Sequence, residues 1–497
     1  MTCAGPEVRA TTMRCLLGLL AVSLLSAATS VAEKPDTRLL EAVKAGDRNG
    51  IRVLLHQHVN VNLGELDGTT ALDWAVQRDD LRSAQLLVDG GANVNIANRY
   101  GITALSLACV NGSAPVIELL LRAGANPNAV LPGGETPLMT AARTGKVDAV
   151  QALLSHDADV NAKEDTRGQT ALMWAAAEGN ATVVEALLHR GADVHARSKA
   201  GFTALLFAAR DGRLEVVREL LKAGVDVNEP LPASSKFASA NALVLAVGNA
   251  HYELAEFLLD SGAKEDAAAL GWTVLHEITW VRKPGAGANP LPPDGSGKVS
   301  SLDFVRAMVR HGADVNARVT KKPYDLGTTN LKVIGATPLL MAARTADAPL
   351  MQLLAQLGAD PLLANVDHTT PLMAAAGVGT QQFGEDPGTE EEVLEAVKVA
   401  LDLGGDINGV DDNGETVIHG AAYKEVPSVV QFLLEKGAKL EIWNRKNKLG
   451  WTPLRISEGV TRGQNIRHRS PATAAVIRHA LSEAGLSTVV EPEKKRE

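Results

Sequence analysis

The sequence predicts an all-α solenoid of about twelve helix–turn–helix repeats joined by short β-hairpin loops. First, a segment beginning Thr-Ala-Leu or Thr-Pro-Leu recurs, with steps of 33, 33, 34 and 33 residues from Thr70 to Thr203. Second, each copy ends in a Leu-rich stretch followed by Gly-Ala-Asp/Asn-Val-Asn or a close variant. Third, aromatic residues make up only 3% of the 497 residues. Such a fixed period is the signature of a stacked repeat architecture, and the composition is typical of short helices packed through small residues.

Each part of the recurring copy predicts a structural feature. The Thr is expected to begin the first helix, where its hydroxyl can cap free backbone N–H groups. A Pro one residue later, as at Pro137, suits the first helical turn. The Ala pairs that follow, such as Ala141-Ala142, let neighbouring helices approach, and Leu pairs such as Leu187-Leu188 fill the space between copies. The Gly ends the second helix in a left-handed conformation.

Twelve copies can be aligned on the residue that begins the first helix. These residues are Thr37, Thr70, Thr103, Thr136, Thr170, Thr203, Asn241, Thr273, Thr337, Thr370, Thr416 and Thr452. One copy cannot bury its apolar face alone, so stacking must supply a continuous core with atypical repeats at both ends.

In length and pattern these copies resemble the ankyrin repeat. The resemblance covers residues 36–460. It implies a concave binding face lined by the first helices and the hairpin tips, and a protein–protein interaction scaffold without chemistry of its own. We expect residues 461–486 to form a C-terminal capping helix and residues 487–497 to be a disordered tail.

Residues 1–32 have the pattern of a secretory signal peptide. The apolar run Cys15–Ala28 is 14 residues long, which is shorter than the roughly 20 residues of a membrane-spanning helix. Ser30–Ala32 then fits a small-x-small cleavage site. Two points stay open. The chain can start at Met1 or Met13, and the alternative to a cleaved signal peptide is an uncleaved anchor. We expect export to the periplasm or the extracellular space of a bacterial host, without membrane insertion after signal cleavage.

Net charge and cysteine content limit the kinds of partner and of site that we expect. The net charge is −9 and no basic block is present, which makes nucleic acid a poor partner. Of the three cysteines, Cys3 and Cys15 fall in the signal segment, so Cys109 remains. Cys109 takes the position of a small core Ala, and we expect it to be a buried apolar residue. We expect a monomer with an unknown protein partner.

The array departs from its own period at four enlarged loops. They lie near residues 229–240, 283–300, 319–334 and 377–392. The second and fourth interrupt repeats eight and ten between their two helices, so they should emerge on one edge with roots roughly 20 Å apart. Loops of this length can touch across that gap, which predicts a composite surface near Trp280, Arg282 and Glu385. The alternative is that both are tolerated surface insertions.

A second candidate surface is the concave face itself. Arg143, Arg210 and Arg344 each follow an Ala-Ala pair. Trp74, Trp174 and Phe207 share another position of the first helix. Aromatic and Arg side chains are enriched among binding hot spots. The alternative is that the aromatic residues serve packing between repeats.

Motifs for catalysis are not found in this sequence. A phosphate loop requires Gly-Lys-Ser/Thr, but Val299 follows Gly297-Lys298. His276-Glu277 lacks the second His of a zinc-protease helix, because position 280 is Trp. The resemblance implies instead that His276 and His419 hydrogen-bond to backbone across repeats. We expect no catalytic, cofactor-binding or metal-binding residues.

The sequence therefore favours a non-catalytic, exported protein–protein interaction scaffold. One alternative is a carbohydrate- or small-molecule-binding protein that uses the loops of repeats eight to ten. Another is a hydrolase built on the inserts, which is disfavoured because the inserts lack a paired nucleophile and base.

Overall fold

Helices arranged in pairs make up the array. The computed structural model describes residues 36–234, 238–264, 270–284, 295–322, 329–380, 385–462 and 466–489. Within these residues twelve helix pairs follow one another, and we number them as repeats one to twelve. The first helices are α1 (Arg38–Ala45), α3 (Ala71–Gln77), α5 (Ala104–Asn111), α7 (Pro137–Thr144), α9 (Ala171–Glu178), α11 (Ala204–Arg210), α13 (Ala242–Gly248), α15 (Val274–Arg282), α17 (Pro338–Arg344), α19 (Pro371–Ala376), α21 (Val417–Lys424) and α24 (Pro453–Gly459). The second helices are α2 (Arg48–His56), α4 (Leu81–Asp89), α6 (Ala114–Arg122), α8 (Val147–Ser155), α10 (Ala181–His189), α12 (Leu214–Lys222), α14 (Tyr252–Asp260), α16 (Ser301–Arg310), α18 (Ala348–Gln356), α20 (Glu390–Asp402), α22 (Pro427–Glu435) and α25 (Pro471–Glu483).

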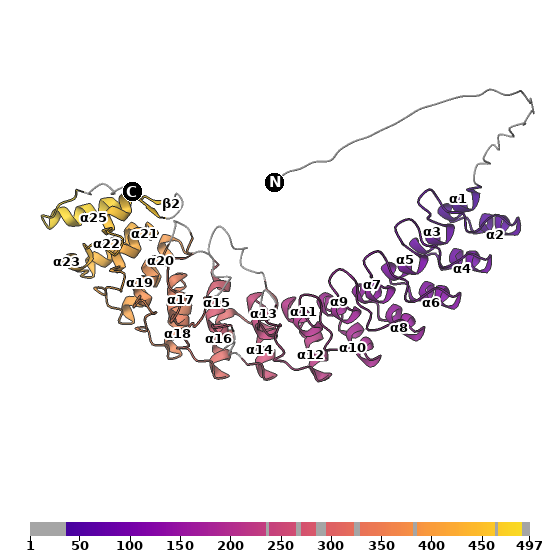
Figure 1. Ribbon diagram of the computed structural model, residues 1–497, viewed down its shortest axis with the longest axis horizontal. Coiled ribbons are helices and arrows are strands. Elements are labelled where there is room, and N and C mark those ends of the chain that lie inside the picture. Colours follow the sequence, from indigo (N-terminus) through magenta and orange to yellow (C-terminus); the bar gives the residue numbers. More distant parts are fainter. Residues whose placement is uncertain are drawn as a thin grey trace, which may run out of the picture.

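The pairs stack side by side into an arc (Figure 1). The first helices run along the inner, concave side of the arc and the second helices along the outer, convex side. Each first helix packs on its own second helix and on the first helices of the neighbouring repeats. The remaining face of each first helix is therefore directed to the inside of the arc.

The capping residues expected from the sequence begin the first helices as predicted. All twelve aligned Thr and Asn residues are N-cap residues in the described part of the chain. Thr70, for example, accepts a hydrogen bond from the backbone N–H of Asp73. At Thr273 and Thr416 the hydroxyl instead contacts the Nδ1 atom of a His three residues later, at 2.9 Å in both cases. Thr37 makes no such cap.

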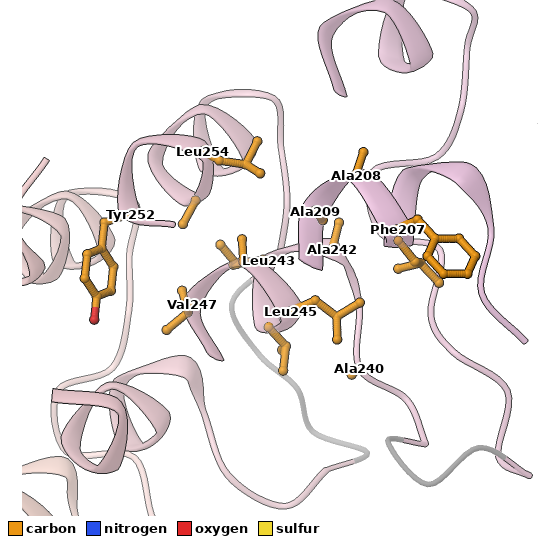
Figure 2. Packing of buried hydrophobic residues seen from close by; sticks show 14 of the residues in the cluster. Phe207, Ala208, Ala209, Ala240, Ala242, Leu243, Leu245, Val247, Tyr252 and Leu254 are labelled. Atoms are coloured by element: carbon orange, nitrogen blue, oxygen red, sulfur yellow. The ribbon is translucent and has the colours of Figure 1, made fainter. Parts of the chain in front are cut away.

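The core runs without interruption from repeat to repeat. Figure 2 shows Ala208 and Ala209 of α11 beside Ala242 and Leu243 of α13, where small side chains let the two helices approach. Further along, the rings of Tyr252 (α14) and Phe304 (α16) stack with their centroids 5.7 Å apart. Cys109 is fully buried in this core, as the sequence predicts.

Asn side chains link consecutive hairpins into a ladder. The Oδ1 atom of Asn95 accepts from the backbone N–H of Asn126 at 2.9 Å, and its Nδ2 donates to the Gly124 carbonyl at 2.9 Å. The same pair of bonds is made by Asn128, Asn161, Asn228 and Asn316. His195 and Leu362 occupy the corresponding positions in repeats five and nine.

The C-terminal repeat differs from the expectation of a capping helix over residues 461–486. A hairpin of β1 (Val460–Arg462) and β2 (Ile466–His468) separates α24 from α25. The helix α25 begins only at Pro471, and it packs on α22 and α24 as a second helix does. A short helix, α23 (Leu440–Trp443), precedes α24. The expected signal peptide (residues 1–32) lies outside the described residues, as do residues 490–497 of the expected tail.

Candidate functional site: the inner face of the arc

Exposure of one repeat position changes steadily along the inner face. This position lies seven residues after the capping residue, and we call it the arginine row because Arg143, Arg210 and Arg344 occupy it. In repeats two to four the residues at this position are exposed, whereas in repeats nine to eleven they are buried. The side chain of Arg143 is 48% exposed and that of Arg344 only 5%. We call the inner side of residues 71–210 the open face and that of residues 274–424 the covered face.

Cations lie over aromatic rings on the open side of the arc. The guanidinium of Arg143 lies 5.1 Å from the ring centroid of Trp174, in the next repeat. That of Arg210 lies 5.0 Å from Phe207. At the N-terminal end, Lys44 lies 4.4 Å from the ring of Trp74. The rings of Trp74 and Trp174 are partly exposed, whereas that of Phe207 is buried. Such contacts hold a cation and an aromatic ring together.

The covered face is closed from the hairpin edge by the enlarged loop near residues 319–334. The backbone N–H of Asn330 donates to the carbonyl of Gly379 at 2.9 Å, and the Thr329 hydroxyl approaches the same carbonyl at 3.3 Å. Gly379 follows α19 and belongs to the insert of repeat ten. Residues 329 and 330 of the loop therefore meet the insert of repeat ten.

The insert of repeat ten closes the covered face from the opposite edge. Arg344 forms an ion pair with Asp386 of this insert, with 2.7 Å between a terminal guanidinium nitrogen and Oδ1. The hydroxyl of Thr380 donates to the other carboxylate oxygen of Asp386 at 2.7 Å. Both charged side chains are buried, with 5% and 3% of their surface exposed. A buried pair of this kind is costly to break, because either partner alone would remain charged away from water.

Lys424 of α21 adds a second cation to this buried cluster. Its ammonium approaches the backbone carbonyls of Pro387, at 3.3 Å, and Arg344, at 3.5 Å. Burial lowers the pKa of Lys424 to about 8, although the nearby carboxylate of Asp386 acts in the opposite direction. The insert is thus held by two cations that come from repeats nine and eleven.

Small residues make room for the insert. A Cβ added to Gly420 would lie 2.7 Å from the backbone nitrogen of Val378, which is closer than real Cβ atoms come. Gly420 stands four residues after its capping Thr416, which is the position that Trp174 occupies in repeat five. At this position the open face has a large ring, whereas the covered face has a glycine. The backbone of the insert packs against that glycine.

The two inserts of repeats eight and ten meet at their roots. Lys283 of the first donates to Glu392 of the second, with 2.8 Å between Nζ and Oε1. This hydrogen bond holds the pKa of Glu392 below its ordinary value. Arg282 lies beside them and binds both carboxylate oxygens of Asp347, at 2.7 and 3.1 Å. Asp347 caps α18 of repeat nine, so this contact ties repeat eight to repeat nine.

The six residues predicted to contact a partner therefore lie in different environments. Arg143 and Arg210 lie on the open face, and Trp280 is half-buried, with its ring 6.4 Å from that of Trp272. Arg282 is engaged by Asp347. Arg344 and Glu385 are buried, which corrects their placement on a binding surface. Arg344 is buried because the insert, which contains Glu385, folds back onto the face from which Arg344 projects.

Comparison with known proteins identifies the family of the N-terminal half of the array. The sequence model described as ankyrin repeats (3 copies) matches residues 39–131, 124–198 and 191–269. Residues 39–269 of the chain are therefore ankyrin repeats. Among solved structures, the crystal structure of the human ASB11 ankyrin repeat domain is similar, with 27% sequence identity and a TM-score of 0.41. The match covers 46% of this chain and 99% of that chain.

The open face of the ankyrin-repeat protein lies within the matched residues, and the covered face begins after them. Sequence reasoning missed Asp386 and Lys424, because nothing local marks them as partners of Arg344. It also missed a third insert, the β1–β2 hairpin of repeat twelve. The backbone N–H of Arg469, which follows this hairpin, donates to Glu425 of repeat eleven at 3.1 Å. The long stretch of sequence between α24 and α25 could have indicated this insert.

The two predicted histidines are structural, as the ankyrin resemblance implies. Nε2 of His276 lies 3.1 Å from the carbonyl of Ala336 in the hairpin to the next repeat. Nε2 of His419 lies 3.1 Å from the carbonyl of Arg445. Both rings are buried, and burial lowers the pKa of each to about 4.

Other features of the described residues bear on the alternative functions. A shallow hollow of about 550 Å³ lies on the convex side between α12 and α14, lined by Arg218, Leu221 and Phe257 among others. None of its lining residues belongs to the loops of repeats eight to ten. Within the described part, no three His, Cys, Asp or Glu side chains are grouped so as to hold a metal ion. No helix of that part is both long and apolar enough to cross a membrane.

Proposed function

We propose that this ankyrin-repeat protein is an exported, non-catalytic scaffold that binds a protein partner on its open face. Ankyrin repeats generally mediate protein–protein interaction, and solenoids of this kind offer an extended concave surface for it. The observation that carries the choice of surface is the contrast within the arginine row. Arg143 is exposed beside Trp174, whereas Arg344 is already neutralised by the chain itself.

Two features of the open face suit partner binding. Arg and Trp are enriched among the residues that dominate binding energy. The exposed side chains of Val110 and Gln77 continue the arginine row toward the N-terminus, so a partner can contact several repeats at once. The covered face lacks this accessibility, since its own loop and insert take the same space.

Export is a separate part of the proposal and depends on residues 1–32 alone. Mass spectrometry of the protein from culture fractions tests it directly. A mature N-terminus at Glu33 in the periplasmic or extracellular fraction would support export. A cytoplasmic protein that retains residues 1–32 would refute it.

The partner-binding part is tested by crosslinking and pull-down from the native compartment with the full chain. Trp174→Ala should abolish capture of the partner, because it removes the ring that supports Arg143. Leu362→Ala, at an exposed residue of repeat nine, is the matched control and should capture normally. Capture that survives Trp174→Ala but is lost with Leu362→Ala would refute the open face as the site.

Point substitutions are preferable to deletion of the inserts. Removing residues 377–392 would take away Asp386, uncover Arg344 and Lys424, and cut off the start of α20. Loss of binding in such a deletion would report on folding as much as on recognition.

A further inference from the structure

On the covered face, an Arg of the arginine row already binds a carboxylate of the chain. On the open face, the equivalent Arg is exposed to solvent. In repeat nine, an Arg of the arginine row receives a carboxylate from a segment that crosses the inner face. The segment supplies Asp386, and the Thr380 hydroxyl binds the second oxygen of that carboxylate. The chain thereby shows which chemistry this row of the array can bind.

Arg143 stands at the same repeat position and is accessible. Its guanidinium lies over Trp174, and the carboxylate nearest to it in the described part is that of Glu135, at 3.8 Å. That distance exceeds the length of a charge-assisted hydrogen bond, which is roughly 2.7–2.9 Å. A guanidinium stacked on a ring keeps its N–H edge available for two-point contact with a carboxylate.

Arg210, in the same row, already binds a carboxylate of the chain. Its Nε and a terminal nitrogen lie 2.8 and 2.9 Å from the two carboxylate oxygens of Asp211. It also lies over an aromatic ring, that of Phe207. Arg143 and Arg210 therefore differ chiefly in whether a carboxylate of the chain already occupies the guanidinium.

An apolar neighbour completes the surface around Arg143. Val110 holds the arginine-row position of the preceding repeat and is 59% exposed. Adjacent repeats are spaced roughly 10 Å apart, and three residues of an extended chain span about the same distance. A peptide that runs along the row can thus place a carboxylate at Arg143 and an apolar side chain at Val110.

We infer that the open face binds an extended segment of a partner protein that presents an Asp or Glu carboxylate to Arg143, with an apolar residue about three positions away at Val110. The segment takes the role that Asp386 and its insert take at Arg344. This inference rests on the proposed function and specifies the chemistry of the partner.

Selection from a phage-displayed library of dodecamer peptides on the full-length protein tests the inference. The selected peptides should be enriched in Asp or Glu at one position and in an apolar residue about three positions away. Their synthetic versions should bind Arg143→Gln at least tenfold more weakly than the wild type, and the Asp→Asn peptide should lose a similar factor. Arg210→Gln is the matched control and should bind within twofold of the wild type, because Asp211 already occupies Arg210.

The possible results are distinguishable. Peptides that bind Arg143→Gln as well as the wild type, that carry no acidic residue, or that are not enriched at all overturn the inference. Peptides that lose binding in Trp174→Ala but not in Arg143→Gln overturn the carboxylate contact while leaving the open face as the binding site. Peptides indifferent to both substitutions count against the inference and the proposed function together. Thermal unfolding of each variant verifies that it is folded, as expected for Arg143, which is exposed.

Discussion

Repeats four and nine contain the same Ala-Ala-Arg segment in different surroundings. In repeat four, Arg143 lies at the surface over the ring of Trp174. In repeat nine, Arg344 is buried against Asp386, which belongs to the insert that follows α19 of repeat ten. The helix that carries the Arg is built in the same way in both repeats, so the difference arises from segments elsewhere in the chain.

This contrast indicates how a repeat array can restrict its binding surface. Repeats two to five keep their period of 33 or 34 residues and present an accessible inner face. Repeats eight, ten and twelve carry segments between their helices, and those segments bond to the neighbouring repeats, as Lys283 does to the carbonyl of Ala346 in repeat nine. The C-terminal part of the array is thereby braced along one edge, while its inner face is used for internal contacts.

The largest expected effect comes from removing the carboxylate that covers the inner face. Asp386→Ala should lower the free energy of unfolding of repeats nine to eleven by about 3–5 kcal/mol, because it leaves Arg344 and Lys424 buried without that counter-charge. Hydrogen exchange followed by mass spectrometry locates the loss.

The matched control for Asp386→Ala is Glu135→Ala on the open face. Glu135 is the carboxylate near Arg143, and the pair is partly exposed, so the change should stay within about 1 kcal/mol. Equal effects of the two substitutions would show that the covered cluster is not buried as described.

Acid should weaken the covered part more than the open part. The pKa of His276 and of His419 is about 4 in the folded protein, below the ordinary 6.5. The unfolded chain therefore takes up more protons as the pH falls below 6.5, and stability present at pH 7 is progressively lost toward pH 4. The expected loss is roughly 2 kcal/mol per histidine between pH 7 and pH 5.

Urea unfolding at a series of pH values, with region-specific hydrogen exchange, measures this loss. His276→Gln and His419→Gln should each flatten the pH dependence, whereas replacement of the exposed His189 by Gln should leave it unchanged. A pH profile that is identical in the wild type and the double variant would contradict the assignment.

The smallest effect concerns the Asn ladder that joins hairpins in both parts. Asn161→Leu removes one accepted and one donated bond to repeat five and should cost about 1 kcal/mol. His195→Asn introduces the residue that makes both bonds elsewhere, and should stabilise the junction of repeats five and six by a similar amount. The urea midpoints of the two variants should move in opposite directions, and a destabilising His195→Asn would show that this junction has adapted to histidine.

The covered face could not be found from the sequence, although its components were visible. The period, the Ala-Ala-Arg segments and the two long inserts all stand in the sequence, and the spacing predicted that the inserts would lie on one edge. Which way the insert folds depends on Gly420 and Gly377 leaving space, and on Arg344 attracting Asp386. Those contacts join residues far apart in the chain, and no local pattern encodes them.

By itself, the sequence determined the features that depend on residues close together in the chain. Capping Thr residues set where each first helix begins, small and Leu residues set how the pairs stack, and the repetition of both identified the array, the buried Cys109 and the two structural histidines. The tertiary structure alone decided which members of the arginine row are accessible. Accessibility depends on whether a distant segment returns to cover a residue, and that outcome follows from the packing of the whole inner face.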